Sequence, residues 1–298
     1  MNFLTITVLG YALNGLTVLI DKILLNKALP HPIIYTFYIS VMGFVTIFFA
    51  PFGFHLNFGV ALWGTLAGIF GVLGTVAYFE SLKHGEASTV PAVIGALNPI
   101  FTLILGFALF KDTLTTTQIL AFFTLLLGAA ILTTKYWMKV RVNKQLALMF
   151  LSGFLFALTA LTLRESFLAS NFISGLVVSR VAGGLLVLPL LFSSHFRIQI
   201  FASRLTKHHF ANKTSMLLLG GQLMGAVGGL LLTFAISLEN PALVNSLFGV
   251  QYLVILTVAL SLYKKHPHLF DERLTKSVVI QKIIGVLFLS LGLYLLAT

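Results

Sequence analysis

Long apolar stretches alternate with short polar links over the whole chain. A helix needs about 20 mostly apolar residues to cross a hydrocarbon core of about 30 Å, and links rich in charged residues, Pro, Gly and Asn divide the chain into stretches of that length. The pattern predicts ten membrane-spanning helices, over residues 3–24, 32–51, 59–81, 87–110, 114–134, 145–168, 171–192, 214–237, 241–263 and 277–297. These helices leave no room for a soluble domain, so the predicted fold is an all-α integral membrane protein.

The composition supports this fold class and excludes several others. Of the 298 residues, 58% are hydrophobic and 9% are charged, with a mean hydropathy of +1.01, whereas a soluble domain carries about 25% charged residues. This excludes a soluble enzyme, a disordered protein and a secreted disulfide scaffold. The chain has no cysteine, and its eight histidines fall in predicted links or at span ends, so we expect no metal site. No phosphate-binding loop occurs, and we expect no cofactor.

The basic residues are distributed unevenly among the links. The chain has 19 Lys and Arg against 8 Asp and Glu, a formal net charge of +11. Sixteen of the 19 fall in odd-numbered links, two (Lys111 and Arg164) in even-numbered links, and Arg180 lies inside a span. Because basic residues stay on the cytoplasmic side, the bias predicts a multi-pass plasma-membrane protein of a bacterium or archaeon with both termini outside. The surplus charge thus indicates topology and contact with anionic lipids, and no nucleic-acid partner is expected.

The chain divides into two similar halves, residues 1–137 and 145–298, joined by a basic link at 138–144. The fourth and ninth spans each follow a Ser-Leu pair, and the fifth and tenth each carry two small residues seven positions apart. Five spans per half place the two copies in opposite orientations. Inverted repeats are a transporter architecture, with the substrate site near the midplane between the copies. The predicted architecture is two inverted five-helix repeats around a central cavity.

Short motifs in both halves resemble a known family. The first half contains Ala77-Tyr78-Phe79-Glu80-Ser81-Leu82, Leu97-Asn98-Pro99-Ile100-Phe101, Asp112 and Gly128, and the second contains Ser179-Arg180, Ala242, Glu272-Arg273-Leu274-Thr275, Gly285 and Gly292. In order and spacing these segments resemble the EamA domain of the drug/metabolite transporter superfamily, and the resemblance covers nearly the whole chain.

The resemblance carries implications about fold and activity. It implies a ten-helix carrier for small metabolites or drugs, made of two EamA-like repeats with a central cavity, and it favours export as the direction of transport. Members of the family usually place both termini in the cytoplasm, opposite to the orientation that the charges predict. The chain departs from the family pattern at Tyr38, where an Arg is often found, at Asp112, which replaces Glu, and in an insertion at 263–271.

Arg180 is the charged residue nearest the middle of a predicted span. A charged side chain at the centre of a membrane helix costs about 2.5–3.5 kcal/mol on insertion scales, so its presence needs a reason. A guanidinium binds a carboxylate or phosphate in a bidentate manner, so one role for Arg180 is to bind such a group on the substrate. The alternative is a structural ion pair within the protein. Three carboxylates are the candidates for that pair: Glu165, Glu80 and Asp21.

The same three carboxylates are candidates for proton coupling. Asp21 and Glu165 occupy matching places late in the first helix of each half, and Glu80 lies near the end of the third span. A carboxyl group in a membrane protein that faces a pathway can carry a coupling proton. The alternative is that each group sits at the membrane interface and meets water.

Uncharged polar residues inside the spans are candidates for lining the cavity. Asn98 lies at the middle of the fourth span, where Pro99 frees a backbone carbonyl and predicts a kink. Gln251 and Tyr252 lie at the comparable depth in the ninth span, which an inverted repeat would place across the cavity. The alternative is interhelical hydrogen bonding, which contributes only about 0.6 kcal/mol on average. The full set of predicted substrate-binding residues is Arg180, Asn14, Tyr38, Tyr78, Asn98, Gln222, Gln251 and Tyr252.

The resulting functional hypothesis is a secondary-active exporter of a small organic metabolite or drug-like solute that works by alternating access. A lipid-linked carrier or flippase on the same fold is an alternative, with Arg180 and the basic links holding a phosphate headgroup. An intramembrane lipid-modifying enzyme is disfavoured, because no histidine lies at membrane depth and no two acidic residues share a span. The expected partners are the solute and the lipid bilayer, and the sequence does not fix the oligomeric state.

Overall fold

The computed structural model describes residues 2–27, 31–84, 89–111, 113–139, 144–202, 213–262 and 276–297, and this part of the chain contains helices and no strand. The first half comprises α1 (Phe3–Lys27), α2 (Pro32–Met42), the 3-10 helix η1 (Gly43–Phe52), α3 (Phe58–His84), α4 (Thr89–Phe110) and α5 (Thr116–Lys139). The second half comprises α6 (Lys144–Ala169), α7 (Phe172–Val187), the 3-10 helix η2 (Leu188–Phe192), α8 (Ser194–Ala202), α10 (Lys213–Leu238), α11 (Pro241–Ser246), α12 (Gly249–Leu262) and α13 (Lys276–Ala297).

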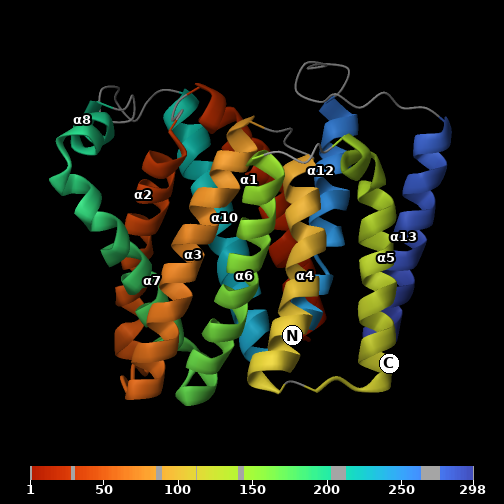
Figure 1. Cartoon of the computed structure of the whole chain (residues 1–298), viewed down its shortest axis with the longest axis horizontal. Coiled ribbons are helices and arrows are strands. Elements are labelled where there is room, and N and C mark those ends of the chain that lie inside the picture. Colours follow the sequence, from red (N-terminus) through yellow and green to blue (C-terminus); the bar gives the residue numbers. More distant parts are fainter. Residues whose placement is uncertain are drawn as a thin grey trace.

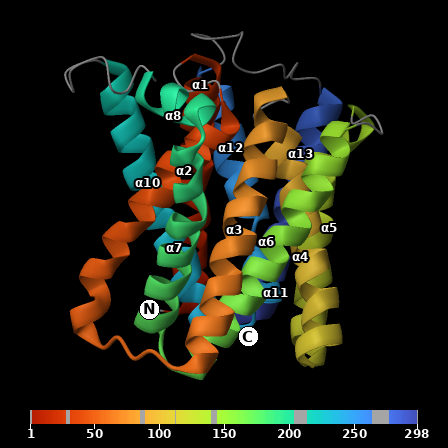
Figure 2. The ribbon, with the colours of Figure 1, turned by 60° about the vertical axis from the view of Figure 1, so that its left-hand side comes forward.

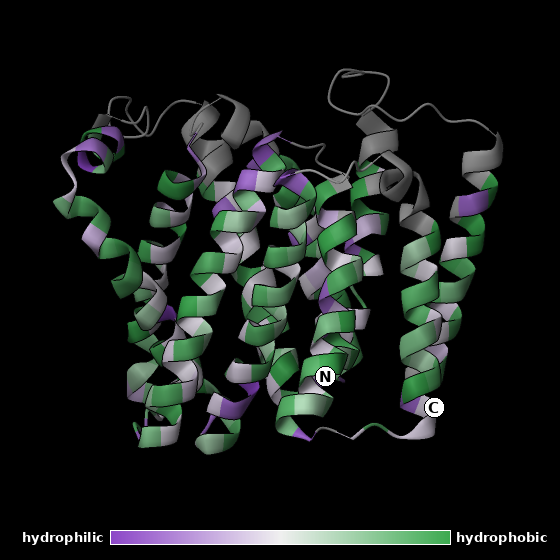
Figure 3. Ribbon diagram, viewed as in Figure 1, coloured by the Kyte–Doolittle hydropathy of each residue, from purple (hydrophilic) through white to green (hydrophobic). Residues whose placement is uncertain are grey.

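The long helices stand side by side, and both chain ends lie at the same end of the bundle (Figure 1). We call this the termini side, and the opposite end, where α8 lies, the link side. Hydrophobic residues cover the middle of the bundle, and hydrophilic residues gather toward the helix ends (Figure 3). Many large apolar side chains are exposed on the surface of the bundle, such as Phe107 and Phe192. An apolar exterior of this kind is compatible with lipid and not with water.

Seven helical segments in the described residues are long and apolar enough to cross a membrane. They are Phe3–Asp21, Pro32–Phe52, Phe58–His84, Val93–Phe110, Lys144–Ala169, Phe172–Phe192 and Leu219–Leu238. The apolar parts of α5, of α11 with the start of α12, and of α13 are shorter, at Thr116–Ile131, Pro241–Ile255 and Ile283–Gly292. The chain is therefore a multi-pass membrane protein, and the number of ten crossings stays a prediction.

Glycines bring three pairs of helices into close contact. On α10, Gly221, Gly225 and Gly228 lie against Ile20, Thr17 and Asn14 of α1 in antiparallel order. Gly64 and Gly74 of α3 lie near Ser166 and Leu155 of α6, and Ser152 donates a hydrogen bond of 3.1 Å to the Gly74 carbonyl. Gly128 of α5 faces Gly285 and Leu289 of α13. Because helices in lipid gain little from the hydrophobic effect, small residues that allow close packing stabilise such pairs.

Three of the predicted apolar stretches are interrupted in ways the sequence pattern did not predict. α2 passes into η1, which carries Pro51 and ends at Gly53 with φ +118°, before the chain turns back to α3 (Figure 2). α7 passes into η2 at Pro189. α11 and α12 are separated at Leu247 and Phe248, and the Phe248 ring packs directly on Gly95 of α4. α8, in the seventh link, was also not predicted.

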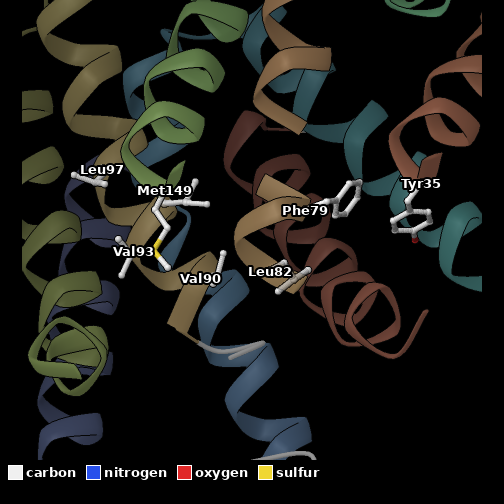
Figure 4. Packing of buried hydrophobic residues seen from close by; sticks show 8 residues of the cluster. Tyr35, Phe79, Leu82, Val90, Val93, Leu97 and Met149 are labelled. Carbon is white, nitrogen blue, oxygen red and sulfur yellow. The ribbon is translucent and has the colours of Figure 1, made fainter. Parts of the chain in front are cut away.

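Two apolar clusters occupy opposite ends of the bundle. On the link side, a cluster of buried residues joins α2, α3, α4 and α6, with the Tyr35 and Phe79 ring centroids 4.6 Å apart (Figure 4). On the termini side, a second cluster contains Ile6, Leu163, Ala235 and Ile236 with side chains from α3, α6 and α11. We call the second one the termini-side cluster.

Several residues singled out from the sequence lie outside the described part of the chain. These are residues 140–143 of the predicted basic link, Asp112, His208, His209, His266 and His268, and the segment 263–275 with its predicted insertion.

Candidate functional site

Arg180 lies on α7 and faces α10. A methyl group added to Gly229 of α10 would lie 3.9 Å from the Arg180 Nη2 atom and would meet nothing else within 4 Å. The Arg180 backbone is held from the other side by Gly43 of η1, whose missing side chain would lie 3.2 Å from the Arg180 carbonyl oxygen. Arg180 is deep in the bundle, yet its side chain retains exposed surface. The guanidinium is therefore surrounded by many protein atoms and still has surface that a ligand can reach.

The guanidinium of Arg180 has no partner in the described part of the chain. No carboxylate there lies within 4.0 Å of it, and no hydrogen bond reaches its nitrogen atoms. Glu80 instead lies 3.5 Å from the Nε2 of His84, one turn further along α3. Asp21 accepts a hydrogen bond from Tyr35. The structural ion pair considered from the sequence is thus not formed, and the five donors of the arginine are available to a ligand.

Asp21 is held in a polar cluster at the link side. Its carboxylate is buried (6% exposed) and accepts a hydrogen bond of 2.5 Å from the hydroxyl of Tyr35 on α2. Gln222 of α10 donates a hydrogen bond of 2.7 Å to the same hydroxyl oxygen, and Tyr78 of α3 interacts electrostatically with Asp21. One carboxylate thus connects four helices that adjoin the interior, and Tyr35 packs on Phe79 beside it (Figure 4).

A second polar cluster joins the two halves at α4 and α11. Asn245 Nδ2 donates to Thr102 Oγ1 at 3.0 Å and to Asn98 Oδ1 at 3.4 Å. The Tyr11 hydroxyl of α1 donates to Asn245 Oδ1 at 3.4 Å. The fourth and ninth stretches therefore meet directly, and the residue opposite Asn98 is Asn245 rather than Gln251 or Tyr252. All three residues around Asn245 satisfy its amide, as buried polar groups require.

The other predicted substrate-binding residues lie apart from these clusters. Tyr38 donates a hydrogen bond of 2.7 Å to the Ile200 carbonyl of α8. Tyr252 is buried in an apolar cluster with Tyr11 and Leu289. The Gln251 backbone carbonyl lies against Gly15 of α1, and Asn14 Oδ1 lies against Gly228 of α10. Asn14 and Arg180 therefore approach neighbouring glycines of one helix from different sides.

The remaining two predictions concern Glu165 and Pro99. Glu165 is half-buried on α6 and already engaged by other groups. Pro99 lies inside α4, which continues from Thr89 to Phe110 across it. Thr102, about one turn after the proline, donates a hydrogen bond of 2.8 Å from its Oγ1 to the Asn98 carbonyl oxygen. Thr102 thereby supports the helix next to the turn where Pro99 removes a backbone donor.

Helix α10 places the polar clusters at defined depths. Gln222, beside Asp21, precedes Gly229, beside Arg180, by seven residues, which corresponds to about 10 Å along the helix axis. Both residues face the interior from the same helix. The sequence pattern indicated Gln222 and Arg180 but not Tyr35, which belongs to the Asp21 cluster, or Thr102 and Tyr11, which belong to the Asn245 cluster. Thr102 lies four residues after Asn98, and that helical spacing is the sequence signal that indicates the pair.

The apolar exterior and the charged and polar groups held between the helices define a multi-pass α-helical membrane protein with an interior polar site. Residues 3–134 match the EamA-like transporter family, in agreement with the resemblance that the motifs indicated. The match indicates a membrane transporter of the drug/metabolite superfamily.

The fold has relatives among solved structures. A crystal structure, titled only as that of a protein, has a TM-score of 0.61 with this chain at 13% sequence identity, covering 98% of this chain and 94% of its own. At this identity the likeness concerns the fold alone. No curated protein matches the chain in sequence.

Proposed function

We propose that the protein is a secondary-active transporter that moves a small organic anion across the plasma membrane by alternating access. The observation that carries the proposal is the Arg180 guanidinium beside Gly229, which has no partner among the residues that the structure describes. An uncompensated charge at membrane depth is costly, and a carboxylate or phosphate of a solute would compensate it through paired hydrogen bonds. The EamA-like match over residues 3–134 supports transport as the activity.

The inverted repeat of ten helices is part of this proposal. Both chain ends lie on one side (Figure 1), and this requires an even number of crossings, which seven long segments alone do not provide. The helix contacts also agree with a repeat in which α1, α3 and α5 of the first half correspond to α6, α10 and α13 of the second. The contact of α3 with α6 then corresponds to the contact of α10 with α1, and α5 packs on the equivalent helix α13. For orientation and direction we propose termini outside, from the Lys and Arg bias, and export, from the family.

A comparison of size-matched solutes tests the charge of the substrate. In the detergent-purified protein, benzoate is expected to raise the melting temperature, while benzamide and benzylamine have no effect. Glucose 6-phosphate and glucose form a second matched pair, in which the melting temperatures with the phosphorylated and the unmodified sugar are compared. A ligand at 100 times its Kd stabilises by about 2.7 kcal/mol, which is readily measured. Stabilisation confined to neutral or cationic solutes would contradict the proposal.

Asp21 is the group that we propose carries the coupling proton. It is buried, its carboxylate accepts a hydrogen bond from Tyr35, whose hydroxyl accepts one from Gln222, and it lies on the link side of Arg180. Asp21→Asn keeps an oxygen that accepts the Tyr35 hydrogen bond but removes the proton site. We expect the variant to lose solute accumulation driven by a pH gradient in proteoliposomes while retaining solute exchange without a gradient.

Glu80→Gln is the matched control for Asp21→Asn, because Glu80 is a partly exposed carboxylate that faces His84 at the end of α3. Its gradient-driven accumulation is expected to equal that of the unmodified protein. Gradient-driven accumulation that persists in Asp21→Asn would exclude Asp21 as the coupling group.

A further inference from the structure

A cavity of about 220 Å³ lies on the termini side, where α6 and α10 end and α7 begins. It is lined by Arg164, Phe167, Leu168, Asn171, Phe172 and Ser237. Its volume is about an order of magnitude more than one water molecule needs. The cavity therefore has room for a group larger than a water molecule, and three of its six lining residues are apolar.

Arg164 lines this cavity and carries a donor without a partner in the described residues. Its Nη1 atom is buried and has no hydrogen-bond partner in the described part of the chain. The other polar groups are already engaged. Asn171 accepts from the Ser174 amide at 2.9 Å and donates to the Gly53 carbonyl at 2.9 Å, and Ser237 donates to the Phe234 carbonyl at 2.7 Å. A buried, unsatisfied guanidinium donor is costly, and an anion would satisfy it.

The cavity and Arg180 lie along the same two helices. On α7, Phe172 at the cavity precedes Arg180 by eight residues, and on α10, Gly229 beside Arg180 precedes Ser237 at the cavity by eight residues. Eight residues of helix correspond to about 12 Å, so both helices give the same separation. The termini-side cluster borders the cavity, because Phe167 belongs to that cluster and Phe172 packs against it. The cavity is thus a separate site, about 12 Å from the depth of Arg180 along both helices.

We propose that this cavity is a second anion-binding site, which holds the carboxylate of an aromatic or apolar solute on Arg164 at the termini side. Phe167 and Phe172 provide apolar and aromatic surface beside the guanidinium. The N-terminus of α7, which begins at Phe172 in the cavity wall, adds partial positive charge. A role of this site in transport rests on the proposed function. The binding of an anion by this site does not rest on it.

A cysteine reporter in the cavity tests the site, because the chain contains no cysteine of its own. Ser237→Cys places one thiol in the cavity wall, and its rate of reaction with N-ethylmaleimide is measured in the detergent-purified protein. Benzoate at ten times its Kd is expected to slow the reaction about elevenfold, because only the unoccupied fraction, 1/(1 + [L]/Kd), reacts. Benzamide, which has the same size and no charge, is expected to leave the rate unchanged.

Three second-site variants assign the protection to Arg164. In the reporter background, Arg164→Gln is expected to abolish protection by benzoate, Arg164→Lys to retain part of it, and Arg180→Gln to retain all of it. An unchanged reaction rate without benzoate shows that each variant keeps the cavity folded. Equal reactivity with and without benzoate in the reporter protein, or protection that survives Arg164→Gln, would overturn the proposal.

The experiment also separates this site from the central one. Protection lost in Arg180→Gln would show that benzoate shields the reporter only from the central site, and it would overturn a separate cavity site. Two results together would support the cavity site and contradict the proposed role of Arg180. Protection of the reporter would be lost in Arg164→Gln, and the benzoate-induced rise in melting temperature would be unchanged in Arg180→Gln.

Discussion

Arg180→Gln is expected to abolish transport of the anionic solute and, in a protein that also carries Arg164→Gln, all detectable binding of that solute. The guanidinium has no carboxylate partner in the described part of the chain, so the substrate anion is its proposed counter-ion. Truncating one partner of a desolvated charge pair costs about 2–5 kcal/mol, and at about 1.4 kcal/mol per tenfold the affinity falls by at least about 30-fold. The measurement is the benzoate-induced thermal shift, followed by solute exchange in proteoliposomes.

Two further variants make this result specific. Arg197→Gln removes the same charge from an exposed position on α8 and is expected to bind benzoate normally. Gly229→Ala places a methyl group 3.9 Å from the Arg180 Nη2 without a clash, so it narrows the space for a ligand and is expected to weaken binding while the protein stays folded. Undiminished affinity for anions in Arg180→Gln would exclude Arg180 as the binding group.

The positions of the helices could be predicted from the sequence because membrane insertion depends on runs of apolar residues. The predicted stretch 145–168 corresponds to α6 at Lys144–Ala169, and 214–237 corresponds to α10 at Lys213–Leu238. The breaks inside the stretches could not be predicted in this way. The break between α11 and α12 falls at Leu247 and Phe248, inside one predicted stretch, where the Phe248 ring packs on Gly95 of α4.

The charged candidates could also be identified from the sequence, because a charge in an apolar run is costly wherever the helix packs. Their partners depend on the rotation and neighbours of each helix, which the sequence pattern does not determine. Asp21 is bonded by Tyr35, an ordinary residue near the start of α2, and Asn98 faces Asn245 rather than Gln251. Arg164, counted from the sequence with an even-numbered link, lines a cavity and has a buried donor without a partner in the described residues.

Gly68→Ala is expected to destabilise the protein more than alanine substitution at other glycines of the same helix. A methyl group at Gly68 of α3 would collide with the Ser179 carbonyl oxygen and would lie 2.8 Å from the Gly183 backbone nitrogen of α7. Backbone atoms cannot rotate away as a side chain does, so the two helices must separate. Overpacking of this kind costs about 1–3 kcal/mol, which corresponds to a lower melting temperature by about 2–4 °C per kcal/mol.

Gly71→Ala is the matched control, because a methyl group there meets Thr159 of α6 at an ordinary 3.5 Å. Gly220→Ala on α10 meets nothing within 4 Å, and both controls are expected to be neutral or to gain up to about 1 kcal/mol from the higher helix propensity of alanine. Equal melting temperatures for Gly68→Ala and Gly71→Ala would contradict the close approach of α3 and α7.

The Gly68 variant also connects packing to the site. The α7 backbone that Gly68 contacts, Ser179 to Gly183, includes Arg180, so a displaced α7 moves the guanidinium away from Gly229. We therefore expect Gly68→Ala to weaken benzoate binding along with stability, whereas Gly71→Ala leaves both unchanged. A variant that is destabilised but binds benzoate with full affinity would show that Arg180 does not depend on the α3–α7 contact for its position.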